Sequence, residues 1–270
     1  MDKKMKKPLL FGAALVLFLL VGGLMAYLQP GEKEGEKAPL ATEVPALSLS
    51  SKAPEGVVWP LEGEMYFPDE ENWVYHFTYD YPQVGGESYA ALMVNDTYKM
   101  ALDEMTQLVL PMFANSPDMR YDGKNEVHHT FDVKCSDERF LSILQKKSQT
   151  RGEEGTFLSL ESLTFDMGGE YLGESLTLRG VVMVGDSTDQ IAAAVLPEIY
   201  AKFQELQKQG ICRSDVDRET FELEFSPAIH FYAVAEGRVA FYLPPVLMAE
   251  PSFDTPTFFY TPLELEALLK

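Results

Sequence analysis

The sequence is poor in cysteine, in histidine and in positive charge. Its 270 residues include two Cys and four His, and 42 acidic residues outnumber 22 basic ones, giving a formal net charge of −20 at pH 7. Two widely separated cysteines exclude a CxxC redox or metal motif. A surface this acidic repels nucleic acid and anionic lipid and favours a cationic partner. The same charge also keeps an exposed domain soluble without any partner.

The motifs of common hydrolases are also absent. The sequence contains no HExxH, no GxSxG, no SxxK and no phosphate-binding glycine loop. Adjacent carboxylates such as Glu153 and Glu154 are frequent in an acidic chain, so a glycosidase pair stays an open alternative. The sequence therefore predicts a protein that is not an enzyme, with no catalytic residue, no cofactor and no metal site.

An uncharged apolar run near the N-terminus predicts a membrane anchor. Four lysines between positions 3 and 7 precede residues 9–28, which carry no charge. As a helix this run spans roughly 30 Å, the thickness of the hydrocarbon core of a bilayer. The lysines predict that residues 1–8 form a cytoplasmic tail and that the remainder is extracellular. The alternative is a signal peptide cleaved near Ala26, which would give a secreted protein.

A segment without sustained periodicity follows the apolar run. Residues 29–56 mix both signs of charge with four prolines, a composition typical of a flexible stalk. Folded sequence is expected from Val57 onward. The sequence thus predicts a single-pass cell-membrane protein whose folded part lies outside the cell.

The remaining pattern predicts an α+β fold. Residues 73–81, WVYHFTYDY, alternate aromatic with other side chains, which indicates a strand with one aromatic face. That face is expected in the core, with a carbohydrate-stacking platform as the alternative. Helical spacing over residues 89–113 predicts one main helix. Asp186 or Ser187 is expected to cap a second, which runs to about Gln209.

Other segments complete an antiparallel sheet and a C-terminal hairpin, loop and helix. Strands are expected over residues 127–135, 140–148 and 155–167, the last with a bulge between Leu160 and Leu163. A short strand is expected near residues 176–178. A Glu236-Gly237 turn joins the last two strands, and Thr261 opens a terminal helix through a capping box.

The histidines and cysteines leave few metal or disulfide options. His128 and His129 point to opposite faces of one predicted strand, which argues against a zinc site. An extracellular location permits a disulfide between Cys135 and Cys212, worth about 4 kcal/mol in the chain-entropy model. Equally, both cysteines can be small buried apolar side chains. The sequence leaves these two alternatives open.

Residues 240–251, AFYLPPVLMAEP, combine large apolar side chains with three prolines. Proline gives no N–H to a sheet, so the strand must end or lie at an edge, and an ordered loop must follow. This stretch and FFYTPLELEAL at 258–268 resemble the end of the extracytoplasmic module of RsiV-like lysozyme-sensing anti-sigma factors. Tyr79-Asp80-Tyr81-Pro82, Asn95 and the first helix resemble the non-catalytic N-terminal region of PdaC-like peptidoglycan deacetylases.

The resemblance implies a deacetylase-associated-like part, residues 57–135, and an RsiV C-terminal-like part, residues 136–270. It implies an extracytoplasmic binding module for peptidoglycan or another cell-wall polymer, or for a cationic wall-active protein such as lysozyme. Neither an appended deacetylase domain nor a sigma-factor-binding domain is expected. The alternatives are a cell-wall hydrolase that uses acidic residues and a structural partner of another membrane protein. The predicted ligand-binding residues are Tyr242, Pro244, Pro245 and Glu250.

Two departures from the family pattern fall in this loop. Val246 stands where the family has a tyrosine after the proline, and Ser252-Phe253-Asp254 replaces its alanine-glycine end. The resemblance therefore predicts the fold more directly than it predicts the ligand.

Overall fold

A computed structural model describes residues 56–115 and 123–270 of the chain. These residues belong to one compact unit, Ala46–Lys270. The predicted tail at 1–8, the predicted anchor at 9–28 and the predicted stalk up to residue 55 lie outside the described residues. Within the described part, no helix has both the length and the apolar character needed to cross a membrane.

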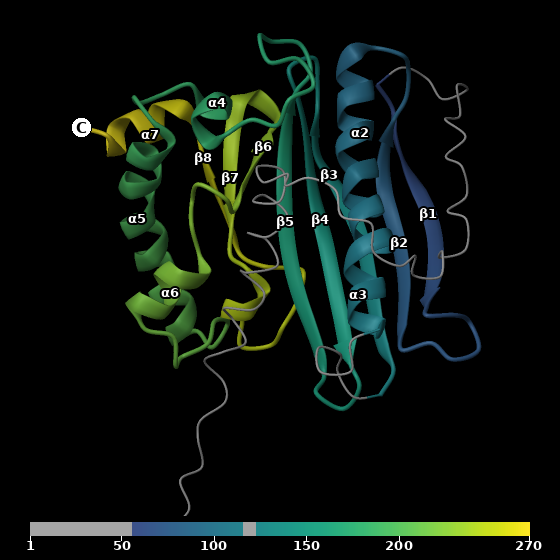
Figure 1. Ribbon diagram of the computed structural model, residues 1–270. Helices are drawn as coiled ribbons and strands as arrows, with labels where there is room; N and C mark the ends of the chain where they lie inside the picture. The colour runs from purple at the N-terminus through teal and green to yellow at the C-terminus, as the bar shows by residue number, and fades with distance from the viewer. Residues whose placement is uncertain (1–55, 116–122) are drawn as a thin grey trace, which may run out of the picture. The chain divides into compact units, whose positions relative to one another are not determined.

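The larger sheet has five strands in the order β1-β2-β3-β4-β5 (Figure 1). Its neighbouring strands are antiparallel except β2 and β3, which are parallel. The strands are β1 (Val58–Phe67), β2 (Tyr75–Val84), β3 (Asn125–Ser136), β4 (Phe140–Arg151) and β5 (Thr156–Asp166). The predicted α+β class is confirmed, but the sheet is mixed rather than wholly antiparallel.

The parallel pair requires a crossover connection, because a tight hairpin joins only antiparallel strands. A helical segment makes this crossover and lies across one face of the sheet (Figure 1). It consists of α2 (Tyr89–Glu104), the π-helical η1 (Met105–Val109) and α3 (Leu110–Asn115). Asn95 of α2 fixes the helix to the end of β2, since its side chain bonds the Val84 N–H at 2.7 Å and the Val84 carbonyl at 2.9 Å.

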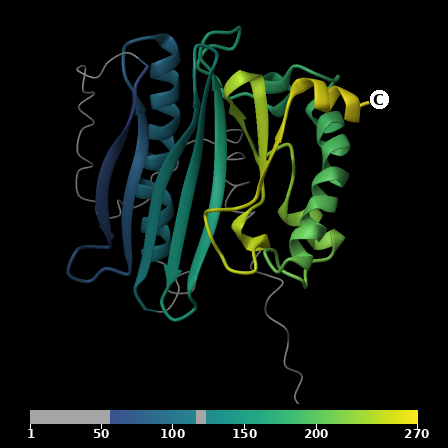
Figure 2. The ribbon, with the colours of Figure 1, turned by 180° about the vertical axis from the view of Figure 1, so that it is seen from behind.

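The aromatic face of β2 forms the core beneath α2. Tyr75, Phe77, Tyr79 and Tyr81 are all buried and pack with Val94 and other apolar side chains of the helix. The prediction that these aromatics belong to the core is confirmed. The alternate residues of β2 consequently point to the other side of the sheet. No described helix crosses β1, β2 or β3 on that side (Figure 2).

The second half of the chain forms a three-stranded sheet with helices. The order is β6-β7-β8, and the N-cap Ser187 of the main helix and the Thr261–Glu264 capping box are confirmed. The hairpin through η2 is confirmed as well. The elements are α4 (Leu178–Val182), α5 (Thr188–Lys208), α6 (Arg218–Glu224), β6 (Phe231–Val234), η2 (Ala235–Gly237), β7 (Arg238–Tyr242), η3 (Pro245–Leu247), β8 (Thr257–Tyr260) and α7 (Pro262–Leu268).

Two local predictions are wrong. The strand expected near residues 176–178 is absent, because Thr177 caps α4, which begins at Leu178. The bulge expected between Leu160 and Leu163 is also absent, because β4 and β5 pair there without a register shift. Leu160 packs against the second sheet and Leu163 against the α2 side. The alternation breaks because both faces of β5 are buried. The register shift lies in β3, between Val133 and Cys135.

The two sheets meet where β6 packs against β3, β4 and β5. The predicted boundary between the two parts of the chain, at residues 135–136, lies at the end of β3. The larger sheet includes strands from both parts, because β3 pairs with β4 along nearly its whole length. Polar side chains contribute to the junction. Ser142 Oγ lies 2.6 Å from Thr164 Oγ1 and accepts a hydrogen bond from the Ala233 N–H at 3.0 Å. These bonds satisfy an N–H of β6 that is buried against the larger sheet.

Candidate functional site

The loop that the sequence predicts as the binding site is mostly buried. Tyr242, Pro244 and Pro245 are buried, and only Glu250 is exposed. The Tyr242 hydroxyl donates to Ser162 Oγ at 3.2 Å. Its ring stacks on Tyr232 at a centroid distance of 6.0 Å. Three of the four predicted ligand-binding residues therefore belong to the packing of the fold.

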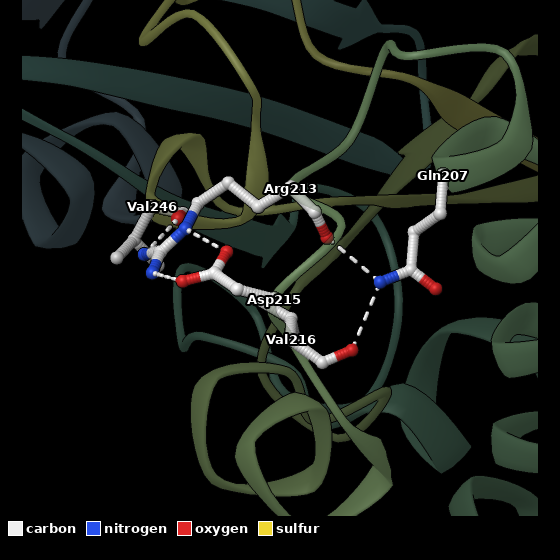
Figure 3. Close-up of polar contacts among 5 residues, drawn as sticks. All are labelled: Gln207, Arg213, Asp215, Val216 and Val246. Atoms are coloured by element: carbon white, nitrogen blue, oxygen red, sulfur yellow. Dashed lines mark hydrogen bonds and ion pairs between the residues drawn. The ribbon is translucent and has the colours of Figure 1, made fainter.

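The loop is ordered, as predicted, by contacts within the chain (Figure 3). Gln207 Nε2 donates to the carbonyls of Arg213 at 2.7 Å and Val216 at 2.9 Å. The Arg213 guanidinium pairs with Asp215 at 2.8 Å and donates to the Val246 carbonyl at 3.3 Å. These bonds tie η3 to the segment between α5 and α6. The Val246 carbonyl of the loop is therefore bonded within the chain and is not open to a ligand.

Both cysteines are free thiols within one hydrophobic core. Cys135 is 7% exposed and Cys212 is 1% exposed. Burial raises the pKa of Cys135 to about 12, helped by the nearby Asp137 carboxylate, and raises the pKa of Cys212 to about 11. Of the two alternatives that the sequence leaves open, a disulfide or two buried apolar side chains, the structure has the buried side chains.

Neither thiol of the native chain is expected to react with a disulfide reagent such as DTNB at pH 8. A pKa of about 11 leaves roughly one thiolate per thousand molecules, and burial blocks access to the sulfur. Absorbance at 412 nm should stay flat for the native chain and report two thiols after guanidinium is added without a reductant. A denatured chain that needs a reductant before it reacts would instead establish the disulfide.

A second surface brings more polar groups together, on the side of β1, β2 and β3 away from α2. Strand pairing places Glu62 opposite Asp80 and Glu64 opposite Thr78, and sets Thr78 beside His128. These five side chains surround a shallow hollow of about 310 Å³, together with Gly63 and Tyr79. We call this surface the β1–β2 hollow. Its residues are far apart in sequence and meet only through the register of three strands.

The hollow is negatively charged and only partly paired. Its lining includes three carboxylates and no lysine or arginine. Glu64 lies 3.3 Å from Nε2 of His76, and Thr78 Oγ1 lies 2.6 Å from His128 Nδ1. For Glu62 and Asp80, the described residues offer no salt bridge. The arrangement can accept hydrogen bonds and attract a cation, and its open form suits a side chain of a larger partner.

An aromatic cluster lies next to the hollow. The rings of Tyr66 and His76 stack at 4.4 Å with an interplanar angle of 3°. Trp73 packs 6.1 Å from Tyr66 and 5.7 Å from His76, and Lys124 Nζ lies 4.1 Å from the Trp73 ring centroid. Partial desolvation, and then the negative charges of Glu64 and Glu70, raise the pKa of Tyr66. Glu64 therefore belongs to both the hollow and this cluster, since it also lies 3.3 Å from His76 Nε2.

The prediction that His128 and His129 lie on opposite faces is confirmed. His128 is exposed at the hollow, whereas His129 is 6% exposed on the α2 side. There its Nδ1 lies 3.0 Å from the Tyr81 hydroxyl. Among the described residues, no group of three His, Cys, Asp or Glu is arranged to hold a metal ion.

One signal for the hollow is present in the sequence of β1 itself. In residues 61–65, Glu62 and Glu64 alternate with Leu61, Gly63 and Met65. This is the period of a strand with one acidic face. Only the pairing with β2 and β3 adds Asp80 and His128.

Comparisons with known proteins give a coarse structural likeness. No family model matches the chain, and no match is found among curated proteins. Similar solved structures include a DUF3298 family protein from Pseudomonas aeruginosa PAO1, at 15% identity and a TM-score of 0.49, covering 78% of this chain and 93% of that one. Another is a DUF3298 member from Bacteroides fragilis, at 11% identity and a TM-score of 0.47, covering 78% and 97%. Neither description mentions RsiV-like or PdaC-like proteins.

Proposed function

We propose that this chain is a membrane-anchored, extracytoplasmic binding module of the cell envelope, not an enzyme, and that it recognises a cationic wall-active protein such as lysozyme. The observation that supports this function is the β1–β2 hollow, where Glu62, Glu64 and Asp80 gather without a lysine or arginine. The net charge of −20 extends the same potential over the molecule. Such a field steers a cationic protein and raises its association rate.

A single exposed charge pair contributes little. Exposed pairs are worth about 0.2–1 kcal/mol each, so recognition requires several lysine or arginine contacts at once. The hollow supplies three carboxylates within one surface. Its shallow form suits a side chain presented by a folded protein better than a small molecule that must be enclosed.

A cell-wall polymer such as peptidoglycan is the second candidate ligand, and a specific observation favours it. Tyr66, Trp73 and His76 form an aromatic cluster beside carboxylates. Aromatic faces pack against the apolar faces of sugars, and carboxylates accept hydrogen bonds from hydroxyl groups. Cosedimentation with purified peptidoglycan tests this alternative, because Trp73→Ala should then release the chain into the supernatant.

Neutralising two carboxylates of the hollow should weaken lysozyme binding by about tenfold at low salt. The double variant Glu62→Gln/Glu64→Gln removes two contacts of about 0.2–1 kcal/mol each, and a combined loss of about 1.4 kcal/mol is tenfold in affinity. Calorimetry of the full-length chain at 50 mM and 500 mM NaCl measures the effect, and the difference between variant and wild type should shrink at high salt.

The matched control for this experiment is Glu198→Gln/Glu266→Gln, which removes two exposed charges from α5 and α7. It leaves the hollow intact and reduces the net negative charge by the same amount as the variant in the hollow. Equal weakening by both pairs would mean that net charge alone drives binding. Absence of lysozyme binding by the wild-type chain would contradict the cationic-partner proposal directly.

A further inference from the structure

The outer edge of β1 carries a further feature. β1 is the end strand of the five-stranded sheet, ten residues long, and no described strand pairs with its outer side. An edge strand presents backbone N–H and C=O groups that can pair with another chain. β1 therefore offers a template along the border of the hollow.

The sequence of β1 disfavours pairing with a second copy of itself. Pro60 has no N–H to donate. In an antiparallel pair of two β1 strands centred on Gly63, each Glu62 would lie opposite a Glu64 on the same face. Like charges directly opposite one another destabilise a sheet. The edge is thus suited to a strand of different composition.

The two faces of β1 specify that composition. Glu62 and Glu64 are exposed on the side of the hollow. Leu61 and Met65 are partly buried on the other side, packed against the core beneath α2. Residues opposite one another on neighbouring strands lie about 4.5–5.5 Å apart. A strand added to β1 would have acidic neighbours on one face and apolar neighbours on the other.

Tyr79 of β2 occupies the space beside the one residue of β1 that has no side chain. A Cβ at Gly63 would lie 2.3 Å from the Tyr79 hydroxyl oxygen, so this ring reaches over β1 where a side chain is absent. Tyr79 is only 7% exposed, so its ring is held in this position by the surrounding core. Burial also raises the pKa of Tyr79, so it stays a donor at neutral pH.

We propose that β1 accepts an extended segment of the cationic partner as an additional strand of the larger sheet. Lys or Arg at alternate positions of this segment faces Glu62 and Glu64, and the apolar residues between them lie beside Leu61 and Met65. The inference rests on the proposed function, because it assigns the recognition mode of the same partner. In strand addition the backbone hydrogen bonds supply affinity and the alternating side chains supply specificity.

Four nine-residue peptides test the proposal with the full-length chain. The first alternates Lys and Val, and the second has the same composition in two blocks. The third and fourth are the alternating peptide with backbone N-methyl groups on every Lys or on every Val. A strand uses one edge for pairing, so one methylated peptide should lose at least tenfold in affinity while the other keeps it. The block peptide should bind at least tenfold more weakly than the alternating one.

The outcomes separate strand addition from the broader function. Equal binding of all four peptides would show attraction by charge alone, which overturns strand addition and leaves the proposed function standing. Lysozyme binding without any peptide binding would also overturn strand addition. No binding of lysozyme or of any peptide would overturn both. Hydrogen exchange of the β1 amides gives a direct readout, since the alternating peptide should slow it and the block peptide should not.

Discussion

Replacing Tyr242 by alanine should lower the free energy of unfolding by about 3–5 kcal/mol, the range for removing a large buried aromatic side chain. Tyr242 is 1% exposed. It packs with Leu144 and Leu160 of the larger sheet, and its ring meets His230 edge-on at 5.5 Å. Removing the ring therefore opens a cavity where the two sheets join. Urea unfolding of the full-length chain, followed by tryptophan fluorescence, measures the loss.

Two variants serve as controls for Tyr242→Ala. Tyr242→Phe keeps the ring and removes only the hydrogen bond to Ser162, so it should cost about 1 kcal/mol. Glu250→Ala lies in the same loop but is exposed, and should change stability by less than about 0.5 kcal/mol. If Tyr242→Ala kept full stability and lost lysozyme binding, Tyr242 would be a ligand-binding residue, as the sequence predicts.

Features fixed by local chemistry were predictable from the sequence. Ser187 caps α5 and Thr261 forms a capping box with Glu264, because side chains three residues apart satisfy the free N–H groups at a helix start. The alternation also places the aromatics of β2 in the core for a similar reason. One face of a strand contains every second residue, whatever the strand pairs with.

Features set by distant contacts were not predictable. The direction of β3 relative to β2 depends on the path of the crossover helix. The sequences of the two strands do not indicate whether they pair in parallel or antiparallel. The broken alternation near Leu160 and Leu163 has two explanations, a bulge or burial on both faces, and only the second sheet decides between them. The prolines and apolar residues after Tyr242 predict an ordered loop. They do not indicate whether a ligand or the chain itself covers that loop.

The hollow shows the same limit. Glu62, Asp80 and His128 are separated by 18 and 48 residues along the chain, and strand register alone brings them together. In a chain with 42 acidic residues, a carboxylate pair is not informative by itself. Only the register of the three strands brings these particular acidic residues together with His128 on one surface.

Lowering the pH from about 6.5 to about 4 should remove about 2–3 kcal/mol of stability through His230 alone. The ring stacks on Phe225 at 5.6 Å, and its Nδ1 accepts the Ser226 N–H at 3.0 Å. Burial lowers its pKa from 6.5 to about 4, which corresponds to about 1.4 kcal/mol per unit, reduced slightly because the side chain is not fully enclosed. The unfolded chain takes up the proton below pH 6.5 and the folded chain does not. This stability is therefore complete above pH 6.5 and is lost as the pH falls towards 4.

The variant His230→Asn isolates this contribution, because the Asn side-chain oxygen can replace Nδ1 as acceptor but does not titrate. Urea unfolding at pH 7, 6, 5 and 4 should show a shallower decline of stability for His230→Asn than for the wild type. Burial, and then Lys147 and His128, also hold the pKa of His129 well below its usual value. His129→Asn should therefore flatten the curve in the same direction. Parallel curves for wild type and His230→Asn would mean that His230 accepts its proton equally well in the folded chain, which would contradict its burial against Phe225.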